Sequence, residues 1–152
     1  MDLSPDWVVG FTDGEGCFHV QVNPHPEMSC GYQVLPEFVV VQHQRDVQVL
    51  HALKRFFGGG SVRRNHGDRY ALRIRRLSVL ERLCEFFLAH PLKTRKNVQF
   101  RKFRRVVQLM LQGEHLRPEG LERIIRICLQ MNTADRPRLR EVLAELKQRI
   151  KR

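Results

Sequence analysis

The chain alternates between stretches of two-residue and of helical hydrophobic periodicity. Apolar and polar residues alternate along 17–23, with Phe18, Val20 and Val22 on one side, which predicts a half-buried β-strand. Residues 32–42 carry a second strand pattern. The loop sequence between them is rich in proline and glycine and predicts that the two strands form a hairpin.

A second hairpin is predicted further along the chain. Strand patterns over 61–65 and 69–75 flank a turn that contains Gly67. Before it, 45–57 carries apolar residues at helical spacing and ends at three consecutive glycines, 58–60, a strong helix stop signal.

Further helices are predicted at both ends of the chain. The apolar segment 7–12 predicts a short helix that ends in a glycine-rich turn, and Ser78 is expected to cap a helix over 78–88. Three more amphipathic helices are predicted over 96–112, 118–131 and 137–150.

The order of these elements is α-ββ-α-ββ-α, followed by extra C-terminal helices. It predicts an α+β fold in which helices cover one face of a four-stranded antiparallel sheet. A chain of 152 residues that is 42% hydrophobic is sufficient for one domain with a core. We expect a single domain over 1–152, with its core in 5–112 and additional helices in 113–152.

The polar sides of the predicted strands carry mostly amide, imidazole and guanidinium groups. Arginine suits guanine and asparagine or glutamine suits adenine in the major groove of DNA, which can admit a β-ribbon. Outward-facing Leu35, Glu37, Val39 and Val41 interrupt this pattern, so an ordinary solvated sheet face is the alternative. The candidate DNA-binding residues are His19, Gln21, Asn23, Gln33, Arg63, Asn65, Arg69, Arg73 and Arg75.

The composition favours a polyanionic partner. The chain has 27 Lys and Arg against 16 Asp and Glu, a net charge of +11, which indicates nucleic acid first and an acidic membrane second. A basic structural or ribosome-associated protein is the alternative. No segment has the roughly 20 apolar residues of a membrane span, and the four cysteines lack disulfide or zinc spacing. We therefore expect an intracellular protein, cytoplasmic or inside an organelle.

The segment 7–18 combines a packing surface with an acidic group. Gly10 and Gly14 lie four residues apart on one helix face, which allows a second helix to approach closely. Glu15 stands between Gly14 and Gly16, so its carboxylate lies beside accessible backbone carbonyls, a donor set that suits Mg²⁺. A glycine-rich turn with a solvated glutamate is the alternative.

Residues 8–16, Val-Val-Gly-Phe-Thr-Asp-Gly-Glu-Gly, resemble the motif of LAGLIDADG homing endonucleases of the type with one motif per chain. The similarity continues through 38–42 and 58–62, more loosely through 91–96, and covers about 5–112. The resemblance implies an αββαββα subunit whose motif helices pair in a homodimer and whose sheets enter the DNA major groove. It implies a site-specific enzyme that makes a staggered double-strand cut in a long pseudo-palindromic target by Mg²⁺-dependent hydrolysis.

The resemblance also implies roles for individual residues. Glu15 and the Gly14 carbonyl would hold Mg²⁺, with Mn²⁺ or Ca²⁺ as alternative occupants. Gln42 corresponds to a position that holds the attacking water, with a solvated strand-end amide as the alternative, and Lys93 and Arg95 lie near the basic active-site residue of the family. The dimer interface would contain Val9, Gly10, Thr12 and Asp13.

The acidic motif raises two questions: the role of Asp13, and whether the protein cuts DNA. Asp13 is expected to accept hydrogen bonds at the helix end rather than to bind metal. A protein without cutting activity, either a maturase acting on intron RNA or a DNA-binding regulator, is the alternative to an endonuclease. The intact Glu15 favours cutting.

Overall fold

A computed structural model describes residues 1–131 and 135–152, whose contacts separate into two compact units. The first unit contains Met1–His19 and Glu37–Phe100, and the second contains Val20–Pro36 and Arg101–Arg152. Strands β1 (Gly16–Pro24) and β2 (Tyr32–His43) and helix α4 (Lys96–Leu111) contribute residues to both units. The single domain expected over 1–152 stays a prediction.

Four strands form one sheet in the order β1-β2-β4-β3, with β3 (Ser61–His66) and β4 (Arg69–Ile74) completing it. β4 lies antiparallel to both β2 and β3. Val39 of β2 pairs with Arg73 of β4, and Phe38 pairs with Ile74. The predicted antiparallel sheet is confirmed, and the fold matches the α+β prediction.

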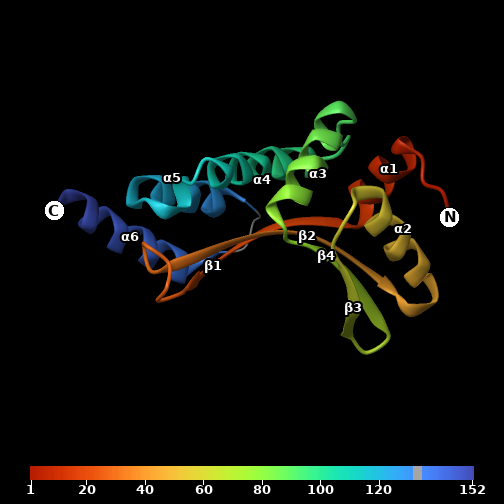
Figure 1. Cartoon of the computed structure of the whole chain (residues 1–152), viewed down its shortest axis with the longest axis horizontal. Helices are drawn as coiled ribbons and strands as arrows, with labels where there is room; N and C mark the ends of the chain where they lie inside the picture. Colours follow the sequence, from red (N-terminus) through yellow and green to blue (C-terminus); the bar gives the residue numbers. More distant parts are fainter. Residues whose placement is uncertain (132–134) are drawn as a thin grey trace. The chain divides into compact units, whose positions relative to one another are not determined.

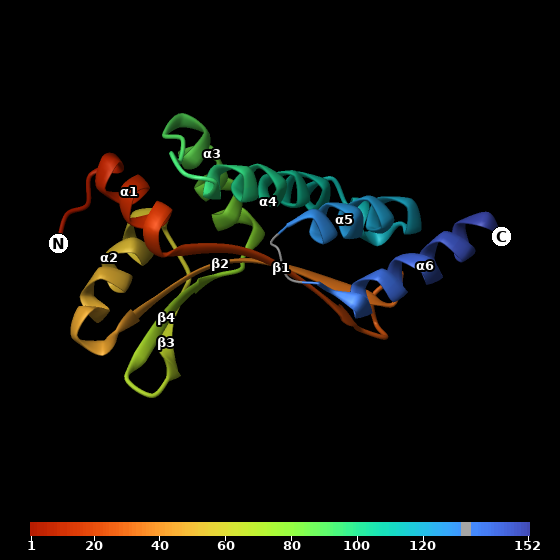
Figure 2. The same cartoon turned by 180° about the vertical axis from the view of Figure 1, so that it is seen from behind.

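In the first unit the helices α1 (Pro5–Glu15), α2 (Val47–Phe57) and α3 (Leu77–Ala89) lie on the same side of the strands (Figures 1 and 2). A short 3₁₀ helix, Gln44–Asp46, precedes α2, which packs against β3 and β4. The core between the layers is rich in phenylalanine, and burial of each such ring contributes about 1.5–3 kcal/mol. Its rings include Phe18, Phe38, Phe57, Phe87 and Phe100.

In the second unit a 3₁₀ helix, Glu114–Leu116, leads into α5 (Pro118–Gln130), which packs against α6 (Pro137–Lys151). The turn of the β1–β2 hairpin is fastened to these helices. The Tyr32 hydroxyl donates a 2.7 Å hydrogen bond to Glu145, and Arg149 donates to the Cys30 carbonyl at 3.0 Å. The C-terminal helices thus support the far end of the hairpin.

Two helix ends differ from the sequence-based expectation. The first helix continues to Glu15, so Gly14 and Glu15 are helical, and the expected turn at these residues is wrong. Extended backbone at Gly16 (φ −78°, ψ 156°) ends the helix and passes directly into β1. Ser78 does not cap α3, because that helix begins at Leu77 and has no side-chain cap.

None of the helices within 1–131 and 135–152 combines the length and the apolar character needed to cross a bilayer.

Candidate functional site

The face of α1 that carries Gly10 and Gly14 is exposed in the part of the chain that the structure describes. Trp7 is 41% exposed and stacks on Phe11 with ring centroids 4.7 Å apart. A Cβ atom added at Gly10 or Gly14 would meet nothing within 4 Å, and neither glycine has positive φ. Neither local crowding nor backbone conformation therefore requires glycine at these two positions. Each glycine lowers the stability of the helix by about 1 kcal/mol relative to alanine. The bare face is open to a second molecule.

The other three residues expected at a dimer interface point elsewhere. Val9 is 6% exposed and Thr12 is fully buried, so both belong to the core of the chain. Helical periodicity explains this arrangement, because positions 9 and 12 lie on the side opposite to Gly10 and Gly14. Of the four predicted interface residues, Gly10 is the one on the bare face.

Asp13 anchors the loop that precedes α4. Its carboxylate accepts hydrogen bonds from the Lys93 N–H (2.8 Å), the Thr94 N–H (3.2 Å) and the Thr94 hydroxyl (2.7 Å). Partial burial alone would raise the pKa of Asp13, but these bonds, helped by the Lys96 charge, lower it below its usual value. Asp13 is therefore a hydrogen-bond acceptor at the helix end, as the sequence indicated.

We expect Asp13→Asn to lower the free energy of unfolding by about 1–2 kcal/mol at pH 7, because an amide is a weaker acceptor for these three donors. Since folding lowers the pKa of Asp13, its charged form stabilises the fold above the pKa of the unfolded chain. That stabilisation is lost as the pH falls through the folded pKa. Urea unfolding at pH 7 and at pH 3 should thus show a smaller difference from wild type at pH 3.

The matched control for this measurement is Asp46→Asn, because Asp46 makes no side-chain cap bond to α2. An equal loss of stability in both variants, or a loss independent of pH, would contradict the anchoring role of Asp13.

Glu15 occupies the last position of α1, and its side chain is exposed. The Gly16 N–H donates to the Thr12 carbonyl, so the carbonyls that follow lie beyond the last hydrogen bond of the helix. The helix C-terminus carries partial negative charge, which favours a cation there. The Glu15 carboxylate and the Gly14 carbonyl are thus oxygen donors that fit a hard divalent cation.

This donor set is incomplete in one chain. Across the part of the chain that the structure describes, no group of three or more His, Cys, Asp or Glu side chains could hold a metal ion.

Lys96, which follows the two basic residues that the sequence put forward, acts on the residues beside Glu15. The charge of Lys96 acts on both Asp13 and Cys17, the residues that flank the α1–β1 junction. Burial raises the pKa of Cys17, and Lys96 opposes that rise. The side chains of Lys93 and Arg95 are exposed, and Lys93 contributes its backbone N–H to Asp13.

Gln42 lies near the end of β2, opposite Tyr70 of β4, and is partly exposed. Because β1 and β2 are neighbouring strands of one hairpin, the end of β2 returns towards the start of β1, next to Glu15. The adjacent His43 is fixed at both ring nitrogens: Nδ1 accepts from the Arg45 N–H at 3.1 Å, and Nε2 lies 2.9 Å from the Asp68 carboxylate. Gln42 is therefore held at the end of the sheet that lies next to Glu15.

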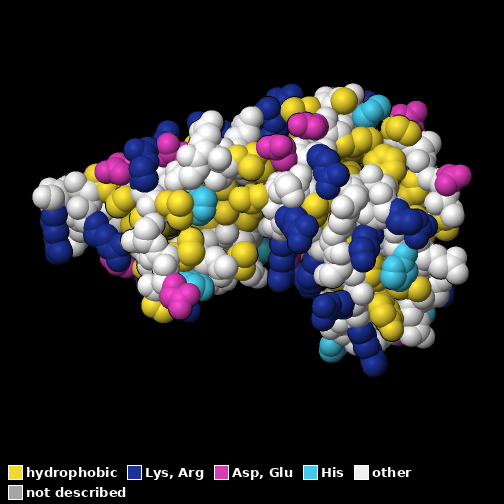
Figure 3. All heavy atoms as spheres, in the orientation of Figure 1, with side chains coloured by type: hydrophobic (Ala, Val, Ile, Leu, Met, Phe, Trp, Pro, Cys, Tyr) yellow, Lys and Arg dark blue, Asp and Glu magenta, His cyan; other side chains and the backbone are white. Residues whose placement is uncertain are grey.

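The opposite face of the sheet in this unit is basic. Figure 3 shows Lys and Arg side chains gathered over the β3–β4 hairpin. A hollow of about 420 Å³ lies on this hairpin. It is lined by Ser61, Arg63, Arg64, Asn65, Ala71, Arg73 and Arg75.

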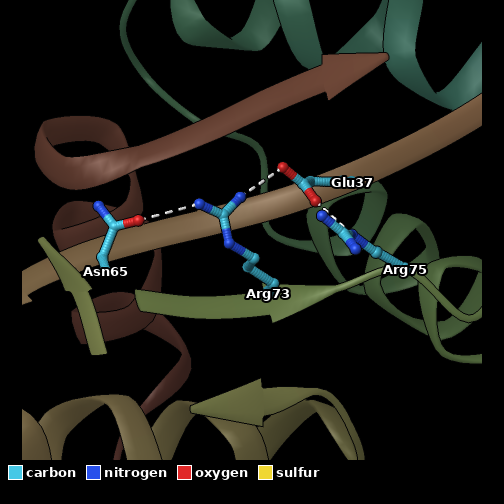
Figure 4. Close-up of polar contacts among 4 residues, drawn as sticks. All are labelled: Glu37, Asn65, Arg73 and Arg75. Atoms are coloured by element: carbon cyan, nitrogen blue, oxygen red, sulfur yellow. Dashed lines mark hydrogen bonds and ion pairs between the residues drawn. The ribbon is translucent and has the colours of Figure 1, made fainter. Parts of the chain in front are cut away.

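A buried glutamate organises this basic surface (Figure 4). Glu37 is 4% exposed and receives Arg73 Nη1 on one carboxylate oxygen at 2.7 Å and Arg75 Nε on the other at 2.5 Å. Arg73 Nη2 also donates to Asn65 at 3.2 Å. Sequence reasoning treated Glu37 as an interruption of the pattern. The signal that could have identified it is an acidic residue on the same sheet face as two arginines.

The remaining candidate DNA-binding residues do not share one location. Arg69 is exposed at the start of β4, and His19 is a partly exposed residue of β1; both belong to the first unit. Gln21, Asn23 and Gln33 belong to the second unit. The first unit therefore brings together Arg63, Asn65, Arg73 and Arg75, but not the whole predicted set.

The sequence profile of the family described as LAGLIDADG endonuclease matches residues 8–107, which include most of α1, the four strands, α2 and α3. The chain belongs to this family. Probable intron-encoded endonuclease 3 of Neurospora crassa is 32% identical over 130 residues, a stretch that covers 83% of this chain and 24% of that protein. The chain thus spans about a quarter of this curated relative.

Solved LAGLIDADG structures resemble the whole fold. The homing endonuclease I-TnaI is 60% identical, with a TM-score of 0.92 and coverage of 96% of this chain and 99% of that one. I-SmaMI, a LAGLIDADG homing endonuclease solved with cleaved DNA, is 32% identical with a TM-score of 0.90; the match covers 95% of this chain and 49% of I-SmaMI. A further structure of I-SmaMI holds uncleaved DNA in the presence of calcium ions.

Proposed function

We propose that this LAGLIDADG chain is a site-specific homing endonuclease that acts as a homodimer on double-stranded DNA. The observation that carries the proposal is the exposed Glu15 at the end of a helix whose bare face includes Gly10 and Gly14. One chain supplies one such acidic centre, and two DNA strands require two. The chain also spans about half of the DNA-bound I-SmaMI, which fits one of two equivalent halves.

A two-fold dimer predicts the form of the target and of the cut. Two identical subunits present the same basic sheet in opposite directions, so the recognition sequence should be long and pseudo-palindromic. Each Glu15 centre acts on one strand. The two cuts are then displaced along the duplex and leave staggered ends.

A divalent cation is the cofactor that suits this site. The Glu15 carboxylate and the Gly14 carbonyl would hold Mg²⁺, with Mn²⁺ or Ca²⁺ as alternative occupants, and DNA phosphates and water would complete its ligands. Such an ion supplies a more acidic water nucleophile and neutralises charge that develops on the phosphodiester. The calcium ions present with I-SmaMI support a site for a divalent cation.

The protein side chains around this centre have separate tasks in the proposal. The Gln42 amide, at the end of β2, is both a donor and an acceptor group and would orient the attacking water. Lys96 stabilises charge on the phosphate from its place near Asp13 and Cys17. Lys93 and Arg95, which the sequence suggested for this role, bind DNA phosphate further from the reacting atoms.

Lys96→Met is expected to lower the cleavage rate by about 10²-fold or more, because it removes a cation that stabilises the transition state. Lys93→Met and Arg95→Met are the matched controls and should change mainly affinity. The measurement is the single-turnover cleavage rate at saturating protein. A larger rate loss in Arg95→Met than in Lys96→Met would contradict this assignment.

The proposed function is tested by selecting bound duplexes from a randomised DNA library with Ca²⁺ present, beside structured intron RNA as competitor. Recovery of one long pseudo-palindromic DNA sequence supports the endonuclease. Preference for the RNA would instead support a maturase, and DNA binding that is never followed by cutting in Mg²⁺ would support a regulator. A DNA substrate also implies action inside the cell, in the cytoplasm or an organelle.

A further inference from the structure

The most unusual group on the basic sheet face is the Glu37 carboxylate. It is 4% exposed and lies on the face that we propose for DNA contact, where a negative charge opposes binding to phosphate. Burial of a carboxylate is costly unless it is paired and hydrogen-bonded. Glu37 should therefore have a role that compensates both for the cost of its burial and for its repulsion of phosphate.

Sheet register explains how Glu37 reaches two arginines at once. Phe38 of β2 pairs with Ile74 of β4, so Glu37 lies one residue beyond this pair, level with Arg75 and diagonal to Arg73. Alternation of side chains places all three on one face. One carboxylate oxygen then serves each arginine, as Figure 4 shows.

The two arginines are held in different ways. Arg73 is braced at both terminal nitrogens, by Glu37 on one side and Asn65 on the other. Its side chain is 35% exposed. Arg75 is held through Nε alone, and its side chain is 52% exposed. Within the described residues, both terminal nitrogens of Arg75 therefore stay available as a two-pronged donor.

We propose that Glu37 is a specificity-determining positioning residue, which fixes Arg75 so that its terminal nitrogens read a guanine in each half of the target. The proposal rests on the proposed function of this sheet as a DNA-binding face. Arginine contacts the O6 and N7 atoms of guanine through two parallel hydrogen bonds, which demands a fixed guanidinium plane. Glu37 and the braced Arg73 supply that plane before DNA arrives.

The same arrangement restrains non-specific binding. An arginine released from its carboxylate is a flexible cation that can pair with any phosphate and so adds affinity without base preference. Glu37 pairs with arginine charge that would otherwise increase affinity for any DNA, so binding becomes more selective. Loss of Glu37 should therefore weaken discrimination and strengthen binding to unrelated DNA, a combination that a purely structural role does not produce.

The experiment compares wild type, Glu37→Gln and Arg75→Gln in a randomised-library binding selection. It also measures affinity for an unrelated duplex at several salt concentrations. We expect Glu37→Gln to lose discrimination by about tenfold at one base pair in each half-site. Its affinity for the unrelated duplex should rise and depend more steeply on salt, with a slope larger by about 1.

Arg75→Gln should relax the base preference at the same position. Because the Arg75 side chain is half-exposed, this variant does not disturb a buried site. The double variant should lose no further discrimination, because both changes act on one contact. Glu141→Gln removes one negative charge from an exposed position on α6 and is the control for net charge.

Two results would overturn the proposal while the proposed function stands. One is an unchanged base preference in Glu37→Gln and in Arg75→Gln. The other is a uniform loss of affinity for every sequence together with a lowered melting temperature, which would make Glu37 a structural residue only. A wild-type protein without base preference would overturn both the proposed function and this proposal, and the wild-type arm alone reveals that case.

Discussion

Glu15→Gln is expected to reduce DNA cleavage by more than about 10³-fold while affinity for the target remains close to that of wild type. Glutamine has the shape of glutamate but no charge, so it cannot provide the anionic ligand that a divalent cation requires. Glu15 is exposed at the end of α1 and contributes nothing to the core, so the variant should fold normally. In the proposed complex, affinity comes from the basic sheet face, which the change does not touch.

This prediction is checked by single-turnover cleavage in Mg²⁺ and by equilibrium binding in Ca²⁺, with Glu141→Gln as the control for loss of one exposed charge. A parallel thermal melt excludes unfolding as the cause. Cleavage that survives in Glu15→Gln would remove Glu15 from the metal site. A simultaneous loss of binding and melting temperature would show that the side chain supports the fold.

Gly10→Leu is expected to abolish the homodimer and yet to leave the subunit folded. Apart from its chain neighbours and the backbone of its own helix, no described residue places an atom within 4 Å of a Cβ at Gly10, so a leucine fits the isolated subunit. Leucine is also the better helix former by about 1 kcal/mol, so the subunit should become slightly more stable. In the proposed dimer, the added side chain would separate two helices that approach each other through the face that carries Gly10 and Gly14.

Light scattering measures the expected loss of the dimer, and denaturant unfolding measures the expected small gain in stability of the subunit. Double-strand cleavage should fall with the dimer fraction, because each chain supplies one Glu15. Gln48→Leu, a neutral change at an exposed position of α2, is the matched control. A variant that remains dimeric with wild-type cleavage would place the subunit interface on another surface.

The sequence predicted those parts of the fold that depend on local patterns. Strict alternation around Phe18 identified β1, and helical spacing followed by three glycines identified α2. Their boundaries lie within one or two residues of those observed. The end of α1 was missed because Gly14 and Gly16 suggested a turn. Gly16 is in fact extended, and the helix passes directly into a strand.

The contacts that long-range pairing creates could not be predicted from local patterns. The role of Glu37 depends on the register of β2 against β4, which places it beside Arg73 and Arg75. The position of Lys96 relative to the α1–β1 junction depends on the loop that Asp13 holds. These residues are more than 30 positions away from their partners in the chain, so spacing alone carried no information about them.

The most direct test of the account is to incubate the protein with Mg²⁺ and a randomised duplex library, beside Glu15→Gln, and to sequence both ends of every cut molecule. A homodimeric endonuclease predicts one long pseudo-palindromic site, with two staggered cuts related by its two-fold axis, in the native protein alone. Cuts without a common sequence, cuts in Glu15→Gln as well, or no cuts at all would contradict it.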